Sequence, residues 1–448
     1  MKSVLVVAHF FPPVGGGGVQ RTLKFVKYLP SFGWRPVVLT ARKSAFGFYD
    51  PTLVDEIPVE ARVYRTAFLA PGHGYRAFRD LLTSGSPGGQ GTRMGWPRKL
   101  ASSVLRPLFK VLHYTANNLV FVPDYEVGWI PFAVVRGVRV IRSERIDAIY
   151  ATGNPWSDFL IAYFLSKLTG RPYIMDMRDP WTLSPDLHWG RVRSSIEGFW
   201  ERRCIMGAAK VINITEQATQ AYRDKYPNVE PSKFQCITQG FDPSDFEGVA
   251  CNQTERFTIG ATGTYYEFRT PESFLKAVRS LMDRNPGLMN DIRVRFMGAG
   301  GEVVSPLVER YHLAEMVEVL PYGSHRESIE FVMSSDVLLL DFLAHVEGRV
   351  NLASTSSRIF EFLASGKTIL GLVYPSGAAA ELITSTGAGV VADPENTDAV
   401  AKTIYALYLQ YKSGTLRVNG QPNLERFTRK HLTGRLAQML DEAIANKG

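Results

Sequence analysis

Cysteine is scarce in this sequence, and the few cysteines form no ligand or disulfide pattern. The 448 residues contain three, Cys204, Cys236 and Cys251, which lie far apart and show no C-x-x-C or Cys/His spacing. This argues against a disulfide framework and against a structural zinc site. Because a reducing compartment suits such a composition, we expect a cytoplasmic protein.

Long apolar runs are also missing. No uninterrupted apolar stretch reaches about 18 residues, the length from which a membrane-spanning helix is expected. Residues 4–11 are mainly apolar, but Pro12, Pro13 and a run of glycines follow where a signal peptide would carry its cleavage site. We interpret this start as a buried first strand.

Motifs of metal-dependent and nucleophilic catalysis are absent as well. The sequence has no Asp-x-Asp pair and no G-x-S-x-G motif, and none of its eight histidines forms an i, i+4 pair. We therefore expect chemistry that depends on arginine and on helix N-termini, with no metal and no other cofactor.

Positive charge is present but unevenly distributed. The formal net charge is +8, and residues 93–145 alone carry nine basic residues against three acidic ones. Such a concentration indicates an anionic surface or partner. We expect no nucleic-acid partner, because this region lacks interleaved aromatic residues and a recognition helix.

Strand-length apolar runs alternate with helical patterns along the whole chain, which predicts an α/β protein with parallel sheets. The chain is too long for one core, so we expect two Rossmann-like domains. The strands expected in the first domain are residues 3–8, 36–40, 148–152, 173–176 and 210–214. Those expected in the second are residues 257–261, 293–297, 317–320, 337–340, 368–373 and 389–391.

A turn-rich segment, residues 239–246, separates these two sets of strands and reads as an interdomain linker. We therefore place the first domain at residues 1–248 and the second at residues 249–425. A C-terminal helix, residues 426–448, is expected to pack back toward the first domain. Residues 72–97 are rich in Ser and Gly and read as a mobile insertion.

Four consecutive glycines, including Gly16 and Gly17, follow the first expected strand and precede a helical pattern. Glycine lets the backbone approach a ligand, and the free N–H groups of the new helix favour negative charge. The pattern is neither a G-x-G-x-x-G motif nor a Walker loop. The alternative is a permissive turn between strand and helix.

A hydroxyl-rich helix start lies in the second domain, at residues 355–367. Ser356, Ser357 and the open N–H groups beside Arg358 could hold a diphosphate, and Glu361 could accept hydrogen bonds from sugar hydroxyls. The alternative is an ordinary N-capped helix with a solvated Glu.

Two further strand ends carry candidate residues. Gly263 and Thr264 lead to Arg269, whose guanidinium could neutralise a leaving phosphate or could simply be a surface arginine. Arg178 and Asp179 follow another strand, at the edge where open α/β sheets bind ligands. An internal Arg–Asp pair is the competing interpretation there.

Two amphipathic segments lie within the basic region. Residues 98–112 combine a broad apolar face with basic residues, although Pro107 must kink or divide a helix there. We predict that this segment contacts an anionic membrane surface. A second segment, residues 129–142, has a similar pattern, for which we favour packing on its own domain.

Taken together, these residues resemble the nucleotide-sugar glycosyltransferases of the GT-B fold, and among them the large family 4. The likeness covers nearly the whole chain apart from residues 72–97. It is carried by the following segments: residues 11–21, resembling the glycine loop; residues 171–181, the end of a first-domain strand; residues 212–217 with 239–242, the exit into the linker; Pro321 and Tyr322, the loop that meets the nucleobase; and residues 356–367, the donor-phosphate and ribose motif.

The sequence departs from the family pattern at three positions. Ala353 stands where a sugar-contacting glutamate is usual, and Gly263 stands where an arginine usually precedes the second cation, here Arg269, by six residues. Arg178 takes the place of a histidine near the anomeric carbon. Relatives with this Arg-Asp-Pro-Trp pattern resemble capsule and polysaccharide enzymes, so the departures look like a subgroup trait.

The resemblance implies two sheets that face each other across a cleft. It also implies transfer of a sugar from a nucleotide-diphosphate donor to a saccharide or lipid-linked saccharide acceptor, with retention and without a metal. We expect Arg269, Arg178 and Asp179 to be catalytic, with a cytoplasmic location at the inner face of the membrane. Two alternatives stay open: a GT-B epimerase or hydrolase, and a catalytically silent sugar-nucleotide binding protein.

Overall fold

The structure is a computed structural model that describes most of the chain. The described residues are 1–42, 49–69, 115–184, 190–250, 255–266, 269–341, 345–346, 349–350, 352–353, 355–416 and 424–446. The predictions for residues 72–97 and 98–112 therefore lie outside the described residues.

The first half of the chain forms a seven-stranded parallel sheet in the order β3-β2-β1-β4-β5-β6-β7. Its strands are β1 (Lys2–Val7), β2 (Trp34–Ala41), β3 (Arg62–Thr66), β4 (Ala148–Gly153), β5 (Tyr173–Met177), β6 (Lys210–Asn213) and β7 (Phe234–Cys236). Its helices are α1 (Gly17–Tyr28), α4 (Ile130–Ser143), α5 (Ser157–Thr169), α6 (Arg191–Gly207) and α7 (Glu216–Lys225).

Both faces of this sheet are buried, as the continuous apolar strands require. Val4 and Val6 of β1 face a core shared with α1, whereas Leu5 and Val7 face a core shared with α4 and α5. Within α4 the buried side chains include Val140, so the helix packs on its own domain, the interpretation favoured for residues 129–142.

The second half forms a six-stranded parallel sheet in the order β10-β9-β8-β11-β14-β15. Its strands are β8 (Phe257–Thr264), β9 (Ile292–Ala299), β10 (Val317–Leu320), β11 (Val337–Asp341), β14 (Thr368–Leu372) and β15 (Gly389–Ala392), and a separate hairpin consists of β12 (His345–Val346) and β13 (Arg349–Val350). Its helices are α8 (Glu272–Arg284), α9 (Gly301–Arg310), α10 (His325–Met333), α11 (Arg358–Ser365), α12 (Ala378–Thr386) and α13 (Thr397–Lys412).

Short helical segments complete the described chain. The 3₁₀ helices are η1 (Leu29–Phe32), η2 (Pro51–Glu56), η4 (Val127–Trp129), η5 (Pro231–Lys233), η6 (Pro243–Phe246), η7 (Pro286–Asn290) and η8 (Glu425–Phe427), and η3 (Ala116–Val120) is a π-helix. Among the helices of the described residues, none combines the length and the apolar character needed to cross a bilayer.

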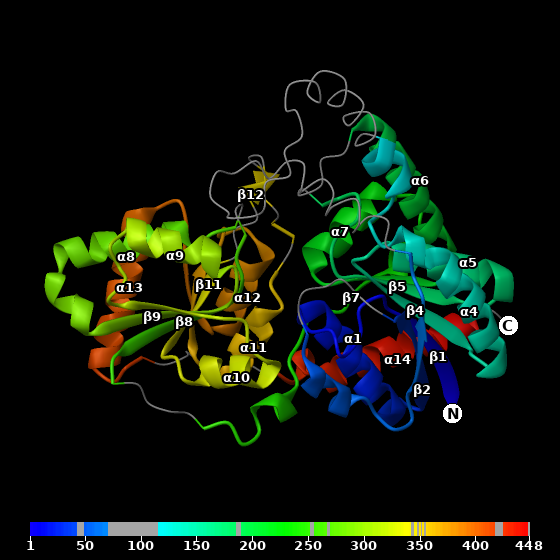
Figure 1. Ribbon diagram of the computed structural model, residues 1–448, viewed down its shortest axis with the longest axis horizontal. Helices are drawn as coiled ribbons and strands as arrows, with labels where there is room; N and C mark the ends of the chain where they lie inside the picture. Colours follow the sequence, from blue (N-terminus) through cyan, green and yellow to red (C-terminus); the bar gives the residue numbers. More distant parts are fainter. Residues whose placement is uncertain are drawn as a thin grey trace, which may run out of the picture.

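The chain passes between the two halves twice, and the two crossings lie side by side. The Phe241 N–H donates to the Phe427 carbonyl at 3.1 Å, and the Arg429 N–H donates to the Phe241 carbonyl at 2.8 Å. The last helix, α14 (Arg429–Ala445), then packs beside α1, where Leu436 enters the first-half core (Figure 1). The C-terminal helix thus belongs spatially to the first sheet.

The α/β fold with two parallel sheets is confirmed, and each of the eleven expected strands overlaps an observed one. Four observed strands were not predicted: β3 and β7, which are the two edges of the first sheet, and the hairpin strands β12 and β13. β3 has the sequence Arg-Val-Tyr-Arg-Thr, and β7 has only three residues. Edge strands are often short and charged. Such strands lack the long apolar run by which the interior strands are found.

Candidate functional site

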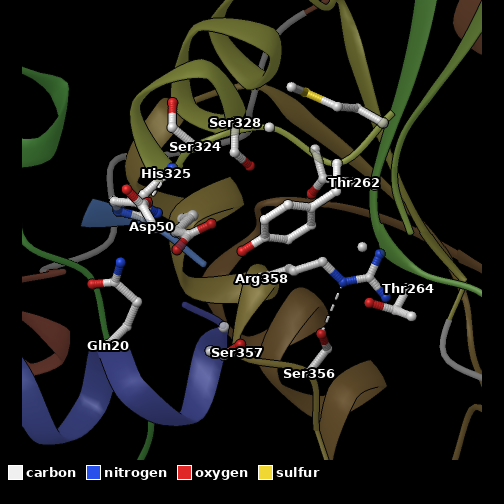
Figure 2. Close-up of a pocket in the computed structure, with 18 of the residues that line it drawn as sticks. Gln20, Asp50, Thr262, Thr264, Ser324, His325, Ser328, Ser356, Ser357 and Arg358 are labelled. Carbon is white, nitrogen blue, oxygen red and sulfur yellow. Dashed lines mark hydrogen bonds between the residues drawn. The ribbon is translucent and has the colours of Figure 1, made fainter. Parts of the chain in front are cut away.

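A cavity of about 350 Å³ lies between the two halves of the molecule, at the carboxyl ends of their strands. This is the edge where open parallel sheets bind ligands. Both halves contribute residues to its wall (Figure 2). The lining residues are Gly16, Gly17, Gln20, Asp50, Thr262, Gly263, Thr264, Tyr266, Arg269, Met297, Gly298, Tyr322, Gly323, Ser324, His325, Ser328, Ser356, Ser357, Arg358 and Glu361.

The glycine loop brings the first half of the chain against the second. A Cβ atom on Gly17 would lie 2.8 Å from Ser357 Oγ, and one on Gly15 would lie 2.9 Å from the Tyr322 hydroxyl. Gly16 has φ 102°, a conformation that favours glycine. The helix α1 begins there with no capping side chain and no acid in its first turn. Its first turn therefore carries no carboxylate of its own that would neutralise the partial positive charge of the N–H groups.

The start of α11 supplies hydroxyl groups on the opposite wall. Ser357 is the N-cap residue of this helix, yet its side chain makes no capping hydrogen bond. The Ser356 hydroxyl accepts a hydrogen bond from Arg358 Nε at 3.1 Å, which fixes the base of the guanidinium (Figure 2). The alternative of an ordinary side-chain-capped helix start therefore does not describe this site.

Two arginines lie together in the cavity wall. Burial first, and then the nearby charge of Arg358, lower the pKa of Arg269 to about 10. The Arg358 guanidinium packs against Gly263, where a Cβ would lie 2.7 Å from Arg358 Nη1. The sequence pattern provides only one phosphate-neutralising cation, because Gly263 replaces the usual arginine. The structure fills that space with a second guanidinium from α11.

A carboxylate and an imidazole form the deeper part of the same wall. Burial raises the pKa of Glu361, an effect that the charge of His325 opposes. Burial lowers the pKa of His325, but its hydrogen bond to Asp245 (Nε2 to Oδ2, 3.1 Å) and the charge of Glu361 outweigh this and raise it. Glu361 is thus a half-buried acceptor beside an imidazole that favours its protonated form.

Most of the predicted site residues line this one cavity, but two do not. Thr264, Tyr322 and the other predicted donor-binding residues lie in its wall. Arg178 instead packs over Gly18, where a Cβ would overlap its guanidinium, and donates a hydrogen bond to the Asn154 carbonyl. Asp179 is exposed and is not among the lining residues.

The internal Arg–Asp pair considered for this strand end exists, but between other residues. Arg21 of α1 donates two hydrogen bonds of 2.8 Å to the Asp176 carboxylate, and both side chains are fully buried. Tyr150 and Thr152 also donate to Asp176. The Asp176 carboxylate therefore holds α1 on the sheet.

Gln20, Asp50, Thr262 and His325 line the cavity but were not predicted. The Asp50 carboxylate accepts a hydrogen bond from the His325 backbone N–H at 3.1 Å, although 275 residues separate them. Only the relative placement of the two halves brings such residues together. Thr262 lies near the end of β8, directly after the expected strand 257–261, and this position was its one sequence signal. Its side chain is buried, and its hydroxyl has no hydrogen-bond partner among the described residues.

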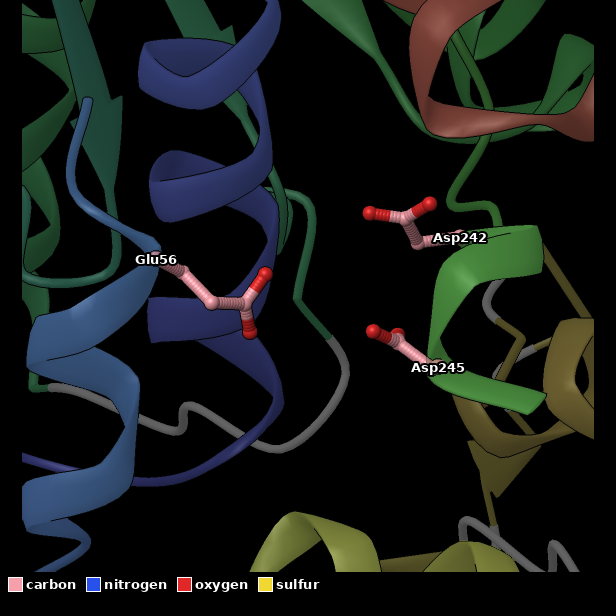
Figure 3. Close-up of side chains that lie close together, drawn as sticks. All are labelled: Glu56, Asp242 and Asp245. Carbon is pink, nitrogen blue, oxygen red and sulfur yellow. The ribbon is translucent and has the colours of Figure 1, made fainter. Parts of the chain in front are cut away.

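One group of carboxylates has the spacing of a metal site. Within the described residues, oxygen atoms of Glu56, Asp242 and Asp245 lie within 4.8 Å of one another (Figure 3). However, the Lys24 ammonium lies 2.7, 3.0 and 2.5 Å from these three side chains. Lys27 adds contacts to Glu56 and Asp242 at 3.0 and 2.9 Å. The group is an ion-pair network that fastens the linker helix η6 to α1.

The two facing parallel sheets with this cavity between them define the GT-B class. Similar solved structures include HepE of Anabaena in complex with UDP and glucose, at 15% identity and a TM-score of 0.60, with 98% of this chain and 99% of that chain covered. Sucrose-phosphate synthase of Thermosynechococcus elongatus shares 12% identity at a TM-score of 0.62, with both chains fully covered. WaaG, a glycosyltransferase involved in lipopolysaccharide biosynthesis, shares 13% identity at a TM-score of 0.56, with 99% of each chain covered.

Residues 16–237 match the glycosyl transferase 4-like domain family. This part of the chain is similar to that family, and the whole chain shares the GT-B fold of the solved glycosyltransferases. No curated protein sequence matches the chain.

Proposed function

We propose that this enzyme transfers a sugar from a nucleoside diphosphate donor to a saccharide or a lipid-linked saccharide, with retention of the anomeric configuration and without a metal ion. The observation that carries the proposal is the meeting of Arg269, Arg358 and the α11 N-terminus at one cavity between the sheets. These groups supply the positive charge that a departing diphosphate needs.

The donor diphosphate is held by the second half of the molecule. Ser356, Ser357 and the two guanidinium groups stabilise the charge that develops as the sugar–phosphate bond breaks. Glu361 accepts hydrogen bonds from the ribose hydroxyls, and the loop at Tyr322 meets the nucleobase. The proposal of metal independence rests on these fixed positive charges.

Transfer occurs on one face of the sugar. The bond from the anomeric carbon to the phosphate oxygen breaks, the bond to the acceptor oxygen forms on the same side, and the acceptor proton passes to the departing phosphate. Retention follows, because both groups occupy the same face. Arg178 and Asp179 follow β5 and do not line the cavity, but Arg178 packs over Gly18 beside the glycine loop, and the two residues are proposed to orient the acceptor.

A panel of nucleoside diphosphate sugars, screened by thermal stabilisation of the protein, tests the donor. UDP sugars come first, because the HepE structure holds UDP. Transfer is then followed by mass spectrometry, and the product anomer is assigned by NMR. The transfer rate is expected to be unchanged after treatment with EDTA, and a lost rate restored by a divalent cation would contradict metal independence.

The same experiment separates the rival functions. Release of free sugar at full rate without an acceptor would indicate a hydrolase or epimerase. Nucleotide binding with no turnover over any acceptor would indicate a binding protein.

A lipid-linked acceptor and contact with an anionic membrane are supported by the outer face of α4. Phe132 and Val135 are exposed there by 37% and 55%, and they line an open groove of about 430 Å³ with Arg65, Arg136 and Arg139. None of the residues that line this groove is acidic. Exposed apolar side chains beside arginines that form no ion pair within the described part of the chain suit an anionic bilayer surface at the inner face of the membrane.

Flotation with liposomes tests this contact. The protein is expected to float with vesicles that contain anionic phospholipid and to stay in solution with neutral vesicles. The double variant R136E/R139E is expected to lose flotation, whereas R284E on α8 keeps it. Wild-type protein that remains in solution with both vesicles would contradict the membrane proposal.

A further inference from the structure

Asp341 is a buried acid at the end of an interior strand. Its carboxylate has no evident role in stabilising the fold. It is the last residue of β11 and is 4% exposed. Neither of its carboxylate oxygens has a hydrogen-bond partner among the described residues. The nearest cation is Arg358, whose Nη1 lies 3.9 Å from Oδ1, too far for a hydrogen bond.

A carboxylate in this environment costs free energy, because burial disfavours its charged form. Burial raises the pKa of Asp341, and the charges of Arg358 and Arg269, together with the neighbouring Tyr265 hydroxyl, oppose this effect without outweighing it. A neutral side chain of the same size would avoid that cost. A residue that opposes stability without an evident structural compensation indicates a functional position.

Three features from separate elements converge on the Arg358 guanidinium. Gly263, at the end of β8, leaves room for its flat face, and Ser356 accepts a hydrogen bond from its Nε. Asp341 faces Nη1, which is itself buried and has no hydrogen-bond partner among the described residues. The guanidinium is thus placed on three sides, while no hydrogen bond within the described part of the chain uses the N–H groups of Nη1 or Nη2.

Asp341 also fixes the position of the second cation, through its backbone. Arg269 Nη2 donates to the Asp341 carbonyl at 3.4 Å. The strand end of β11 therefore lies between the two guanidinium groups that line the cavity. A displacement of this residue would move both.

We propose that Asp341 is a positioning residue that orients the Arg358 guanidinium toward the donor diphosphate, in the space that Gly263 leaves open. This inference rests on the proposed function, because the diphosphate is the anion that Arg358 meets. Asp341 does not contact the donor itself. It attracts Nη1 with its charge and so keeps Arg358 in the rotamer that points into the cavity.

The test compares two explanations that predict opposite signs. If Asp341 acts only through its charge, its removal lowers the negative potential near an anion and tightens diphosphate binding. If it acts by positioning Arg358, its removal weakens diphosphate binding, and only while Arg358 is present. Calorimetric Kd values are measured with UDP and UMP for the wild type, D341N, R358A and the double variant.

We expect D341N to bind UDP at least about threefold more weakly than the wild type, with UMP binding unchanged. In the R358A background, the same substitution is expected to leave UDP binding unchanged or to tighten it. The melting temperature of D341N is expected to stay the same or to rise, since a buried charge is removed. The control is D336N, directly before the start of β11, where an amide oxygen can still accept the Thr258 N–H.

Each other outcome is decisive. Equal weakening by D341N with and without Arg358, or tighter UDP binding in both backgrounds, overturns the positioning role. Wild-type protein that binds none of the nucleoside diphosphates of the panel overturns the proposed function and this inference together. Wild-type protein that prefers another nucleoside diphosphate has its Kd values measured with that diphosphate and its monophosphate.

Discussion

Arg269 is held in the cavity wall at an electrostatic cost. Burial and the neighbouring Arg358 lower the pKa of Arg269 to about 10, so its cationic form is less favourable here than in water. A diphosphate between the two guanidinium groups would reverse this effect, because it adds negative charge where two positive charges repel. The same arrangement favours the transition state, in which negative charge on the phosphate increases.

The variant R269A is expected to lower kcat at least a hundredfold at saturating donor. Loss of one such donor group typically costs about 3–4 kcal/mol in the transition state. The rate is measured by release of the nucleoside diphosphate, and R284A, an exposed arginine of α8 paired with Asp398, serves as the control. An unchanged rate in R269A would refute its role.

The predictable residues of the site are those fixed by their own strand or helix. Ser356, Ser357 and Glu361 follow from a hydroxyl-rich helix start, and Gly263 follows from the end of an apolar strand. Asp341 also ends an apolar strand, at residues 337–340, and the same rule would have found it. Asp50 and His325 could not be found in this way, because each faces the cavity only after the two halves meet.

At the level of elements, the interior strands can be predicted from the sequence because both of their faces are buried. β1, β4 and β14 are almost wholly apolar and were found. The edge strand β3 carries two arginines, and the side of α4 that faces solvent carries three more. The position of such elements depends on their neighbours in the sheet, and they have no long apolar run of their own from which they could be predicted.

The helix α14 shows how a late element can stabilise an early one. Leu436 is fully buried in the core that contains Leu23 and Phe25 of α1. The variant L436A is expected to lower the free energy of unfolding by about 2–5 kcal/mol, because it leaves a cavity between helix and sheet. The measurement is urea denaturation monitored by tryptophan fluorescence.

Leu409 of α13 supplies the matched control, since it is 48% exposed. The variant L409A is expected to change the free energy of unfolding by no more than about 0.5 kcal/mol. Equal losses in the two variants would contradict the packing of α14 described here.

For the whole molecule, several contacts between the two facing sheets are polar. Thr215 donates to the Ala353 carbonyl, Gln217 donates to Glu381, and Asp50 receives the His325 N–H. Polar contacts of this kind can break and reform without exposing a core. They suit the proposed function if the halves separate to exchange the nucleotide and close again for transfer.

His325 makes this junction sensitive to pH. Its imidazole bonds Asp245 of the linker and lies near Glu361 of α11 and Lys24 of α1; the first two raise its pKa, whereas burial and Lys24 lower it. The net pKa is raised above the unfolded value of about 6.5. Its contribution to stability is therefore complete below about pH 6.5 and is lost as the pH rises through the folded pKa.

The variant H325Q is accordingly expected to have a lower melting temperature than the wild type near about pH 6, and the difference is expected to shrink near about pH 9. Glutamine keeps a polar side chain but cannot carry the charge that attracts Asp245 and Glu361. The exposed His431 provides the control, because H431Q should leave the melting temperature unchanged at both pH values. A difference between H325Q and the wild type that grows with pH would mean that the imidazole is held neutral, and that the junction depends on Lys24 and the linker carboxylates alone.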